Sequence, residues 1–387
     1  MRKAWLIFAQ SVAALVLVGA ALLALDRFIP GLLPFDGGPV TIHEVVAGGR
    51  AVQASTFSEA AARSRPSVVN IFTSKEIRAP RSPFMDDPMF RRFFGDRFQL
   101  NSRPQRVSNL GSGVIVSQDG FILTNHHVIE AADEIQVALP DGKVLDAKLV
   151  GTDPETDLAM LKVEWKDLPA ITFAKAETLQ VGDVVLAIGN PFGVGQTVTM
   201  GIVSALGRNH LGINTFENYI QTDAAINPGN SGGALVDAAG NLVGVNTAIF
   251  SRSGGNLGIG FAIPVSIVRQ VMEQIIAHGT VTRGWVGIEV QEITPEIAES
   301  FSLKSTEGAL IAGVLRGGPA DRAGIHPGDV LVAVGGRPVQ DSSSLLNLIS
   351  ALPPGRLAQL KLVRDQTEMQ LMVAVEKRPA YRKTSQE

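Results

Sequence analysis

Short apolar runs separated by turn residues recur through the middle of the chain and constrain its fold more than any other feature. They are rich in β-branched residues and extend from Val68 to Ile263. The 387 residues also include 40 glycines and 21 prolines but only 6% aromatic residues. This combination favours all-β barrels over helical bundles. The length exceeds what one hydrophobic core serves, so we expect two domains plus additional segments.

Two groups of strands are predicted. The first occupies 67–72, 113–116, 121–124, 134–139, 145–152, 159–163 and 184–188, and the second occupies 196–205, 218–222, 234–236, 242–248 and 258–263. A short helix before Pro66 precedes the strands, and a helix from Ile263 to about Gly279 follows them. Residues 78–109 form a long, basic, Phe-rich loop inside the first group, and loops of this length are usually functional or disordered.

The N-terminal stretch Ala4–Leu25 carries no charge and follows Arg2-Lys3 directly. At about 1.5 Å per residue it spans a hydrocarbon core of about 30 Å, which predicts a transmembrane anchor in residues 1–27 and a tether over 28–60. A cleaved signal peptide is the alternative, because Val18-Gly19-Ala20 resembles a cleavage site. The apolar run continues past that site, which favours the anchor. The positive flank predicts a cytoplasmic N-terminus, with the rest of the chain in the periplasm of a bacterium.

The segment Gly229-Asn230-Ser231-Gly232-Gly233 predicts a nucleophilic serine. Small flanking residues leave the hydroxyl accessible and let backbone N–H groups face an oxyanion. A serine also needs a neutral imidazole to take its proton and a carboxylate to orient that imidazole. His127 and Asp157 supply these groups upstream, and the order His, Asp, Ser is that of chymotrypsin-type proteases.

Each candidate has a simpler alternative. His126 is the other candidate for the base, but we expect it to be a solvated neighbour of His127. Asp153 and Asp223 are the other candidates for the acid, beside Asp157. Six histidines without cysteine or a His-Glu-x-x-His motif disfavour a metal site, so no metal or other cofactor is expected. The absence of cysteine excludes disulfides. A net charge of −3 gives no reason to expect a nucleic-acid partner.

The segment Gly120–Ile129, the Asp157 segment and the Ser231 loop together resemble the HtrA family of serine proteases, over about Val68 to Val375. The resemblance implies a mainly β fold, with a chymotrypsin-like pair of six-stranded β-barrels in a protease domain over 61–280. It implies that the triad lies at the seam of the barrels, and that the base is the histidine directly before Val-Ile, His127.

Two further positions refine the expected chemistry. Trypsin has an aspartate directly before its nucleophile, whereas this chain has the uncharged Asn230, so a charge-driven activation by N-terminal trimming is not expected. We expect the N–H groups of Gly229 and Ser231 to form the oxyanion hole, and another trigger to order their loop. Ala225 stands where trypsin holds its specificity acid, which predicts a small, apolar pocket for residues such as Val or Ala.

Residues 281–378 resemble a PDZ domain, followed by a polar tail over 379–387. The segment Arg283–Ile288 resembles the carboxylate-binding loop and first strand of such domains, and a helix over 341–352 is expected to form the other wall of a groove. A peptide would add a strand there, with its carboxylate on backbone N–H groups. The expected peptide-binding residues are Trp285, Val286, Gly287, Leu346 and Ile349. A purely structural β-module is the alternative.

An anchor, one protease domain and one PDZ domain form the layout of the membrane-anchored HtrA branch that includes DegS and AlgW. That resemblance implies a sensor of the C-termini of misfolded outer-membrane proteins that cleaves a membrane anti-sigma factor in envelope-stress signalling. It also implies a homotrimer with Phe57 or a neighbour at the contact. Arg208 matches an arginine that links peptide binding to active-site ordering in that branch, although an ordinary surface arginine is equally compatible.

The 78–109 loop is longer than that of DegS and resembles the loop of general degradative members. A broad periplasmic quality-control protease or chaperone is therefore the alternative function. A non-catalytic PDZ scaffold is disfavoured because all three triad positions are present.

Overall fold

The computed structural model describes residues 56–77, 105–130, 132–175, 178–190, 195–249 and 257–379. The predicted anchor, the tether up to residue 55, residues 78–104 of the predicted loop and the tail from residue 380 lie outside these ranges. Within the described ranges, no helix has the length and apolar character needed to cross a membrane.

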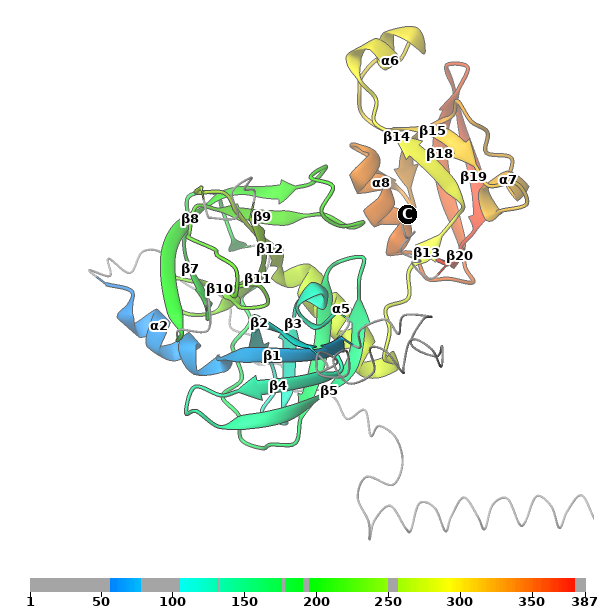
Figure 1. Cartoon of the computed structure of the whole chain (residues 1–387). Coiled ribbons are helices and arrows are strands. Elements are labelled where there is room, and N and C mark those ends of the chain that lie inside the picture. The colour runs from blue at the N-terminus through cyan, green and yellow to red at the C-terminus, as the bar shows by residue number, and fades with distance from the viewer. Residues whose placement is uncertain are drawn as a thin grey trace, which may run out of the picture. The chain divides into compact units, whose positions relative to one another are not determined.

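Two closed β-barrels of six strands each form the N-terminal part of the described chain (Figure 1). The first barrel contains β1 (Val68–Ile77), β2 (Gln105–Ile115), β3 (Phe121–Thr124), β4 (Glu134–Ala138), β5 (Val144–Asp153) and β6 (Leu158–Val163). The second contains β7 (Val184–Gly189), β8 (Thr197–Arg208), β9 (Tyr219–Thr222), β10 (Ala234–Asp237), β11 (Leu242–Ile249) and β12 (Gly260–Pro264). The predicted pair of six-stranded barrels is thus confirmed.

Two details of the predicted strands are wrong. The sequence pattern places the 184–188 strand in the first group, but β7 pairs with β8 and β10 and so belongs to the second barrel. The predicted loop 78–109 is also too long, because β1 and β2 continue outward as a hairpin to the pair Ile77 and Gln105. Both differences depend on pairing between distant strands, which local patterning does not report.

Helices flank the barrels. The short helix α2 (Ser58–Ser64) continues into the 3-10 turn η1 (Arg65–Ser67), and α5 (Val265–His278) follows the last barrel strand. Gly279 ends α5 in the left-handed conformation, with φ of 70°, as expected for a C-terminal glycine. Both helices were predicted from the sequence.

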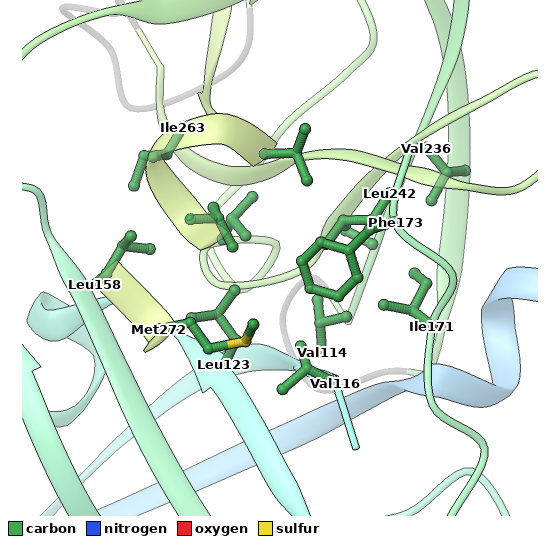
Figure 2. Close-up of a cluster of buried hydrophobic side chains, with 14 of the residues drawn as sticks. Val114, Val116, Leu123, Leu158, Ile171, Phe173, Val236, Leu242, Ile263 and Met272 are labelled. Atoms are coloured by element: carbon green, nitrogen blue, oxygen red, sulfur yellow. The ribbon is translucent and has the colours of Figure 1, made fainter. Parts of the chain in front are cut away.

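The two barrels and α5 share one hydrophobic core (Figure 2). Leu123 and Leu158 come from the first barrel, Leu242 and Ile263 from the second, and Met272 from α5. Each barrel also has its own interior cluster. Because close-packed interiors resist displacement, the shared core fixes the seam at which residues from the two barrels meet.

The C-terminal part forms a separate module around its own core. Its main sheet runs in the order β14 (Ile288–Gln291), β15 (Ala309–Val314), β16 (Val330–Val334), β18 (Leu357–Arg364) and β19 (Thr367–Ala374). The short strands are β13 (Gly284–Trp285), β17 (Arg337–Pro338) and β20 (Glu376–Lys377), and the helices are α6 (Pro295–Ser300), α7 (Pro319–Arg322) and α8 (Ser342–Ser350). Strand β14 lies at an edge of this sheet, as the predicted peptide groove requires.

Candidate active site

The three candidate triad residues come from both barrels. His127 lies in the short helix α4 (His126–Ile129), directly after β3, and Asp157 lies in the turn between β5 and β6. Ser231 lies in the turn that leads into β10. The first barrel thus supplies the histidine and the aspartate, and the second supplies the serine.

Asp157 binds His127 twice. Nδ1 of the His127 ring lies 2.7 Å from Asp157 Oδ2, and the His127 backbone N–H donates to Oδ1 at 2.9 Å. A carboxylate accepts hydrogen bonds, so in the neutral ring the proton resides on Nδ1 and Nε2 keeps its lone pair. This is the tautomer that a general base needs.

The same geometry separates the alternatives. Asp153 pairs with Arg283 and accepts a hydrogen bond from Thr156, and Asp223 accepts the backbone N–H of Ile202 at 2.7 Å. His126 keeps a buried Nδ1 that has no hydrogen-bond partner within the described ranges. Of the aspartates and histidines considered, only Asp157 and His127 form a pair.

The environment of Asp157 keeps its carboxylate ionised. Burial alone raises the pKa of Asp157, but the hydrogen bonds and charge of His127 and the hydroxyl of Thr247 outweigh burial and hold the pKa below its usual 3.8. The residue has φ of 60°, a left-handed conformation that aspartate tolerates better than most residues. The turn therefore directs a charged carboxylate at the imidazole.

Thr247 is a site residue that the sequence analysis missed. Its hydroxyl donates to Asp157 Oδ2 at 2.7 Å, and its backbone carbonyl accepts a hydrogen bond from Ser231 Oγ at 3.2 Å. It lies at a β-bulge, since Asn246 and Ala248 of β11 oppose the consecutive residues Ala262 and Phe261 of β12. A threonine in a β-strand is unremarkable in sequence, so no local signal marked it.

The serine hydroxyl is in a resting arrangement. Ser231 Oγ donates to the Thr247 carbonyl, and among the described residues it forms no hydrogen bond with His127. Catalytic hydrogen bonds are often long before substrate binds. Before His127 can take the proton, the Ser231 hydroxyl has to exchange the Thr247 carbonyl for the imidazole as its hydrogen-bond acceptor.

The turn before Ser231 has the geometry of an oxyanion site. Asn230 N–H donates to the Asn227 carbonyl at 2.9 Å, and Gly229 has φ of 100°. Pro228 and Gly229 thus occupy the central positions of a type II turn, which favours these two residue types. Among the described residues, the N–H groups of Gly229 and Ser231 have no hydrogen-bond partner, whereas those of Asn230, Gly232 and Gly233 do.

The residues expected to shape the specificity pocket lie beside this turn. Ala225 is half-buried between the fully buried Ala224 and Ile226, and its carbonyl accepts the Thr199 hydroxyl at 2.8 Å. Asn230 is buried, and its Oδ1 has no partner among the described residues. A neutral amide is tolerated here more readily than an unpaired charge would be.

Comparisons with known proteins agree with this geometry. The family model for a trypsin-like peptidase domain matches residues 111–245, and that for a PDZ domain matches residues 284–375. A probable periplasmic serine endoprotease DegP-like of Chlamydia muridarum is 47% identical over 340 residues, which cover 84% of this chain and 68% of the relative. A protein with the same name from Hahella chejuensis is 46% identical, covering 85% and 72%.

Solved structures give the same result. The HtrA-type protease AlgW with a decapeptide is 52% identical, with a TM-score of 0.72 over 84% of this chain and 100% of that chain. The serine endoprotease from Yersinia pestis is 38% identical, with a TM-score of 0.62 over 84% and 99%. The chain belongs to the HtrA family of serine proteases. The predicted HtrA-family serine endopeptidase with one PDZ domain is thereby confirmed.

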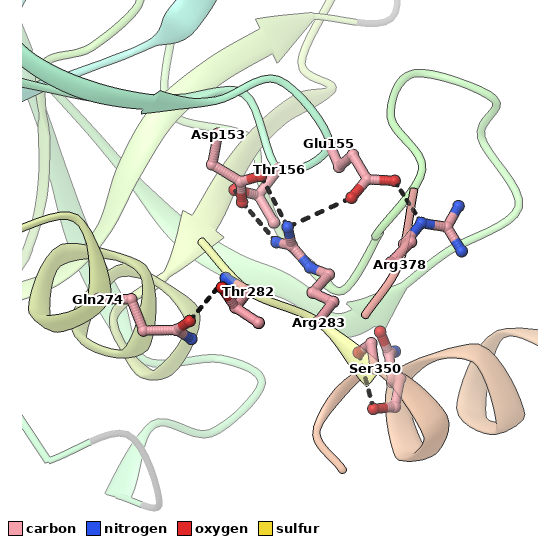
Figure 3. Close-up of polar contacts among 9 residues, drawn as sticks. Asp153, Glu155, Thr156, Gln274, Thr282, Arg283, Ser350 and Arg378 are labelled. Carbon is pink, nitrogen blue, oxygen red and sulfur yellow. Dashed lines mark hydrogen bonds and ion pairs between the residues drawn. The ribbon is translucent and has the colours of Figure 1, made fainter. Parts of the chain in front are cut away.

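A buried ion-pair cluster connects the PDZ domain of this HtrA protease to the loop that carries Asp157 (Figure 3). Arg283 donates to Asp153 at 2.7 Å and to Glu155 at 3.3 Å, and its guanidinium lies 4.3 Å from the Phe216 ring centroid. Arg378 donates to the other carboxylate oxygen of Glu155 at 2.7 Å. Both ends of the PDZ domain therefore bind the segment that leads to Asp157.

The residues predicted to bind peptide in the PDZ domain of this HtrA protease divide into two groups by the burial of their side chains. Val286 and Ile349 are buried in the domain core, so their side chains do not line a groove here. Trp285 and Leu346 are half-exposed, and Gly287 has φ of 76° beside the Trp285 ring. The half-exposed pair is available to a ligand.

Arg208 lies at the end of β8, where its Nε donates to Gln221 Oε1 at 2.8 Å. The loop that follows is organised by Glu217, whose carboxylate accepts the N–H groups of Leu211, Ile213 and Asn214. Phe216 N–H donates to the Glu155 carbonyl at 3.0 Å. The loop after Arg208 thus contacts the segment that carries Asp157.

Proposed function

We propose that this protein is a periplasmic, inner-membrane-anchored serine endopeptidase that is switched on by C-terminal peptides bound to its PDZ domain. Its proposed substrate is a membrane-spanning anti-sigma factor, and its proposed activators are the C-termini of misfolded outer-membrane proteins. The catalytic part of this proposal rests on the His127–Asp157 pair, which is joined by two hydrogen bonds. The relatives named as periplasmic endoproteases support the compartment.

The proposed mechanism is acyl transfer. Nε2 of His127 takes the proton of Ser231 as Oγ attacks the scissile carbonyl, and Asp157 stabilises the imidazolium that forms. The N–H groups of Gly229 and Ser231 bind the oxyanion of the tetrahedral intermediate. Collapse breaks the peptide bond, and His127 gives its proton to the leaving amine. Water then hydrolyses the acyl-enzyme by the same route.

Peptide recognition is assigned to the open edge of β14. An extended peptide adds a strand there through backbone hydrogen bonds, with Leu346 and Trp285 offering exposed apolar surface. Val286, Gly287 and Ile349 contribute through the backbone and the shape of the domain. The AlgW structures with a decapeptide and a tripeptide support binding of short peptides by a relative.

The signal is proposed to pass through the loop after Arg208. His210 in this loop lies 3.3 Å from the Ser343 hydroxyl on α8, which forms one wall of the expected groove. At its other end the loop contacts Glu155 through Phe216. A change in α8 on peptide binding can thus reach the segment that carries Asp157 through two direct contacts. Coupling between distant sites is carried by such contiguous contacts.

The same proposal includes a trimer of anchored chains. Phe57 is half-exposed and packs against the hydrophobic core that the two barrels share, so part of its ring is free to contact a neighbouring copy. Sedimentation of the detergent-solubilised protein at micromolar concentration tests this point, and a monomer would remove the trimer from the proposal.

We expect peptide-dependent cleavage from the full-length protein in detergent. A hydrophobic C-terminal peptide should raise the cleavage rate of a reporter substrate, and Arg208→Ala should reduce that stimulation about 5- to 150-fold, the usual range of allosteric coupling. Peptide affinity, measured by fluorescence anisotropy, should change little, because Arg208 lies in the protease domain. Arg356→Ala, which removes an exposed arginine from the PDZ domain, serves as the matched control.

An Arg208→Ala enzyme that responds to peptide like the parent would end the relay proposal. Rapid casein cleavage without any peptide would instead favour the second candidate, a general quality-control protease. That candidate is supported by the DegP-like names of the curated relatives.

A further inference from the structure

Ser112 on β2 is fully buried at the seam of the barrels, and all of its polar groups are hydrogen-bonded. Its hydroxyl donates to the Gly229 carbonyl at 2.6 Å and accepts the N–H of Asn190 at 2.9 Å. Its backbone N–H donates to the Ser231 carbonyl at 2.9 Å. Its own carbonyl accepts the Thr124 hydroxyl at 2.7 Å. One residue of the first barrel therefore binds two carbonyls of the nucleophile turn in the second.

These two carbonyls determine the orientation of the turn. The Gly229 carbonyl belongs to the peptide unit between residues 229 and 230, and the Ser231 carbonyl belongs to the unit between 231 and 232. The unit that bears the Ser231 N–H lies between them. Fixing both flanking units restricts the dihedral angles that set the direction of this N–H. The unit that bears the Gly229 N–H adjoins the first of them through the type II turn.

The strand that carries Ser112 and the nucleophile turn are closely packed. A Cβ on Gly232 would come within 2.2 Å of the Ser112 carbonyl oxygen, and Gly232 has φ of 82°. Cβ atoms on Gly111 and Gly113 would come within 2.4 Å of Val128 and 2.8 Å of Ile122. The nucleophile turn therefore packs directly against the backbone of Ser112, and the Ser112 hydroxyl is the side-chain group that binds the Gly229 carbonyl.

We propose that Ser112 is a positioning residue for the oxyanion hole. It holds the N–H groups of Gly229 and Ser231 in the direction that the tetrahedral intermediate requires, although it touches neither substrate nor the reacting atoms. Preorganised donors of this kind contribute most of their effect in the transition state. The inference rests on the proposed roles of Ser231 and its turn.

Ser112→Ala in the full-length protein tests the proposal. We expect kcat for a peptide substrate to fall about 10- to 100-fold, less than the loss of an oxyanion donor itself, with KM changed by less than about twofold. Affinity for a peptide aldehyde, which forms a tetrahedral adduct with the serine, should fall by a similar factor. Affinity for the uncleaved peptide, measured on a Ser231→Ala background, should stay the same.

Ser64→Ala is the matched control. Ser64 is also buried, and its hydroxyl donates to the Ala60 carbonyl at 2.7 Å in α2. The Ser64→Ala substitution removes the same atom and the same type of hydrogen bond at a position away from the active site. It should therefore lower the stability of the protein without changing kcat. Should Ser112→Ala fail to fold, Ser112→Cys, which keeps a larger γ atom with a weaker donor, is judged by the same measurements.

Two outcomes overturn the proposal. One is a kcat like that of Ser64→Ala, and the other is a fall in kcat without a matching loss of aldehyde affinity. Failure of the proposed function gives a different result, because Ser231→Ala would then retain activity whatever Ser112→Ala does.

Discussion

Ser231→Ala and His127→Ala should each lower kcat about a millionfold, because triad residues act as one unit and the loss of one member removes the contribution of the others. Asp157→Ala should cause a large but smaller loss, since it removes the partner that holds His127 in the correct tautomer. Single-turnover cleavage of a fluorogenic peptide measures these rates, and circular dichroism checks that each variant is folded.

His126→Ala is the matched control for the histidine. His126 precedes His127 in the same short helix, and Asp157 binds the ring of His127. We therefore expect His126→Ala to keep most of the parent activity. Substantial activity in His127→Ala, with loss in His126→Ala, would show that the wrong histidine has been chosen.

Arg283→Ala should lower the free energy of unfolding by about 3–5 kcal/mol, because it leaves the buried carboxylates of Asp153 and Glu155 without this partner. The guanidinium also packs over Phe216, so packing is lost together with charge. Urea denaturation followed by tryptophan fluorescence gives the change. Proteolysis should fall as well, because the same segment leads to Asp157.

Arg322→Ala is the comparison. Arg322 pairs with Glu376, and about half of each side chain is exposed to solvent (52% and 48%). Exposed pairs contribute about 0–1 kcal/mol, so this variant should unfold close to the parent. Equal destabilisation by the two variants would contradict the assignment of the Arg283 cluster as a buried anchor of the PDZ domain.

The architecture and the triad candidates were predictable because their signals are local. His127, Asp157 and Ser231 each lie in a short motif, and their order along the chain indicates a chymotrypsin-like fold, which the two barrels confirm. The helix over 265–278 has an apolar face and is followed by a glycine, so the position of its C-terminal end was also predictable.

The features that the sequence did not predict depend on contacts between residues that are distant in the chain. Thr247 and Ser112 are ordinary strand residues whose partners lie in other strands and turns, and β7 could be assigned to its barrel only through its pairing. The groove prediction paired Leu346 with Ile349, but Ile349 shares the buried face of α8 with Leu345, four residues earlier. Leu346 and Ile349 are three residues apart and so are neighbours on the helix surface. The helical period therefore does not separate them, and Ile349 is buried because it packs in the domain core.

The bulge at Thr247 makes the alignment of the triad a property of strand register. One extra residue in β11 binds Asp157 through its side chain and Ser231 through its main chain. We expect local opening of β11 to remove this common support from Asp157 and Ser231 in one event. We expect a molecule opened in this way to be inactive, because the Asp157 carboxylate and the Ser231 hydroxyl then lose the residue that binds both of them.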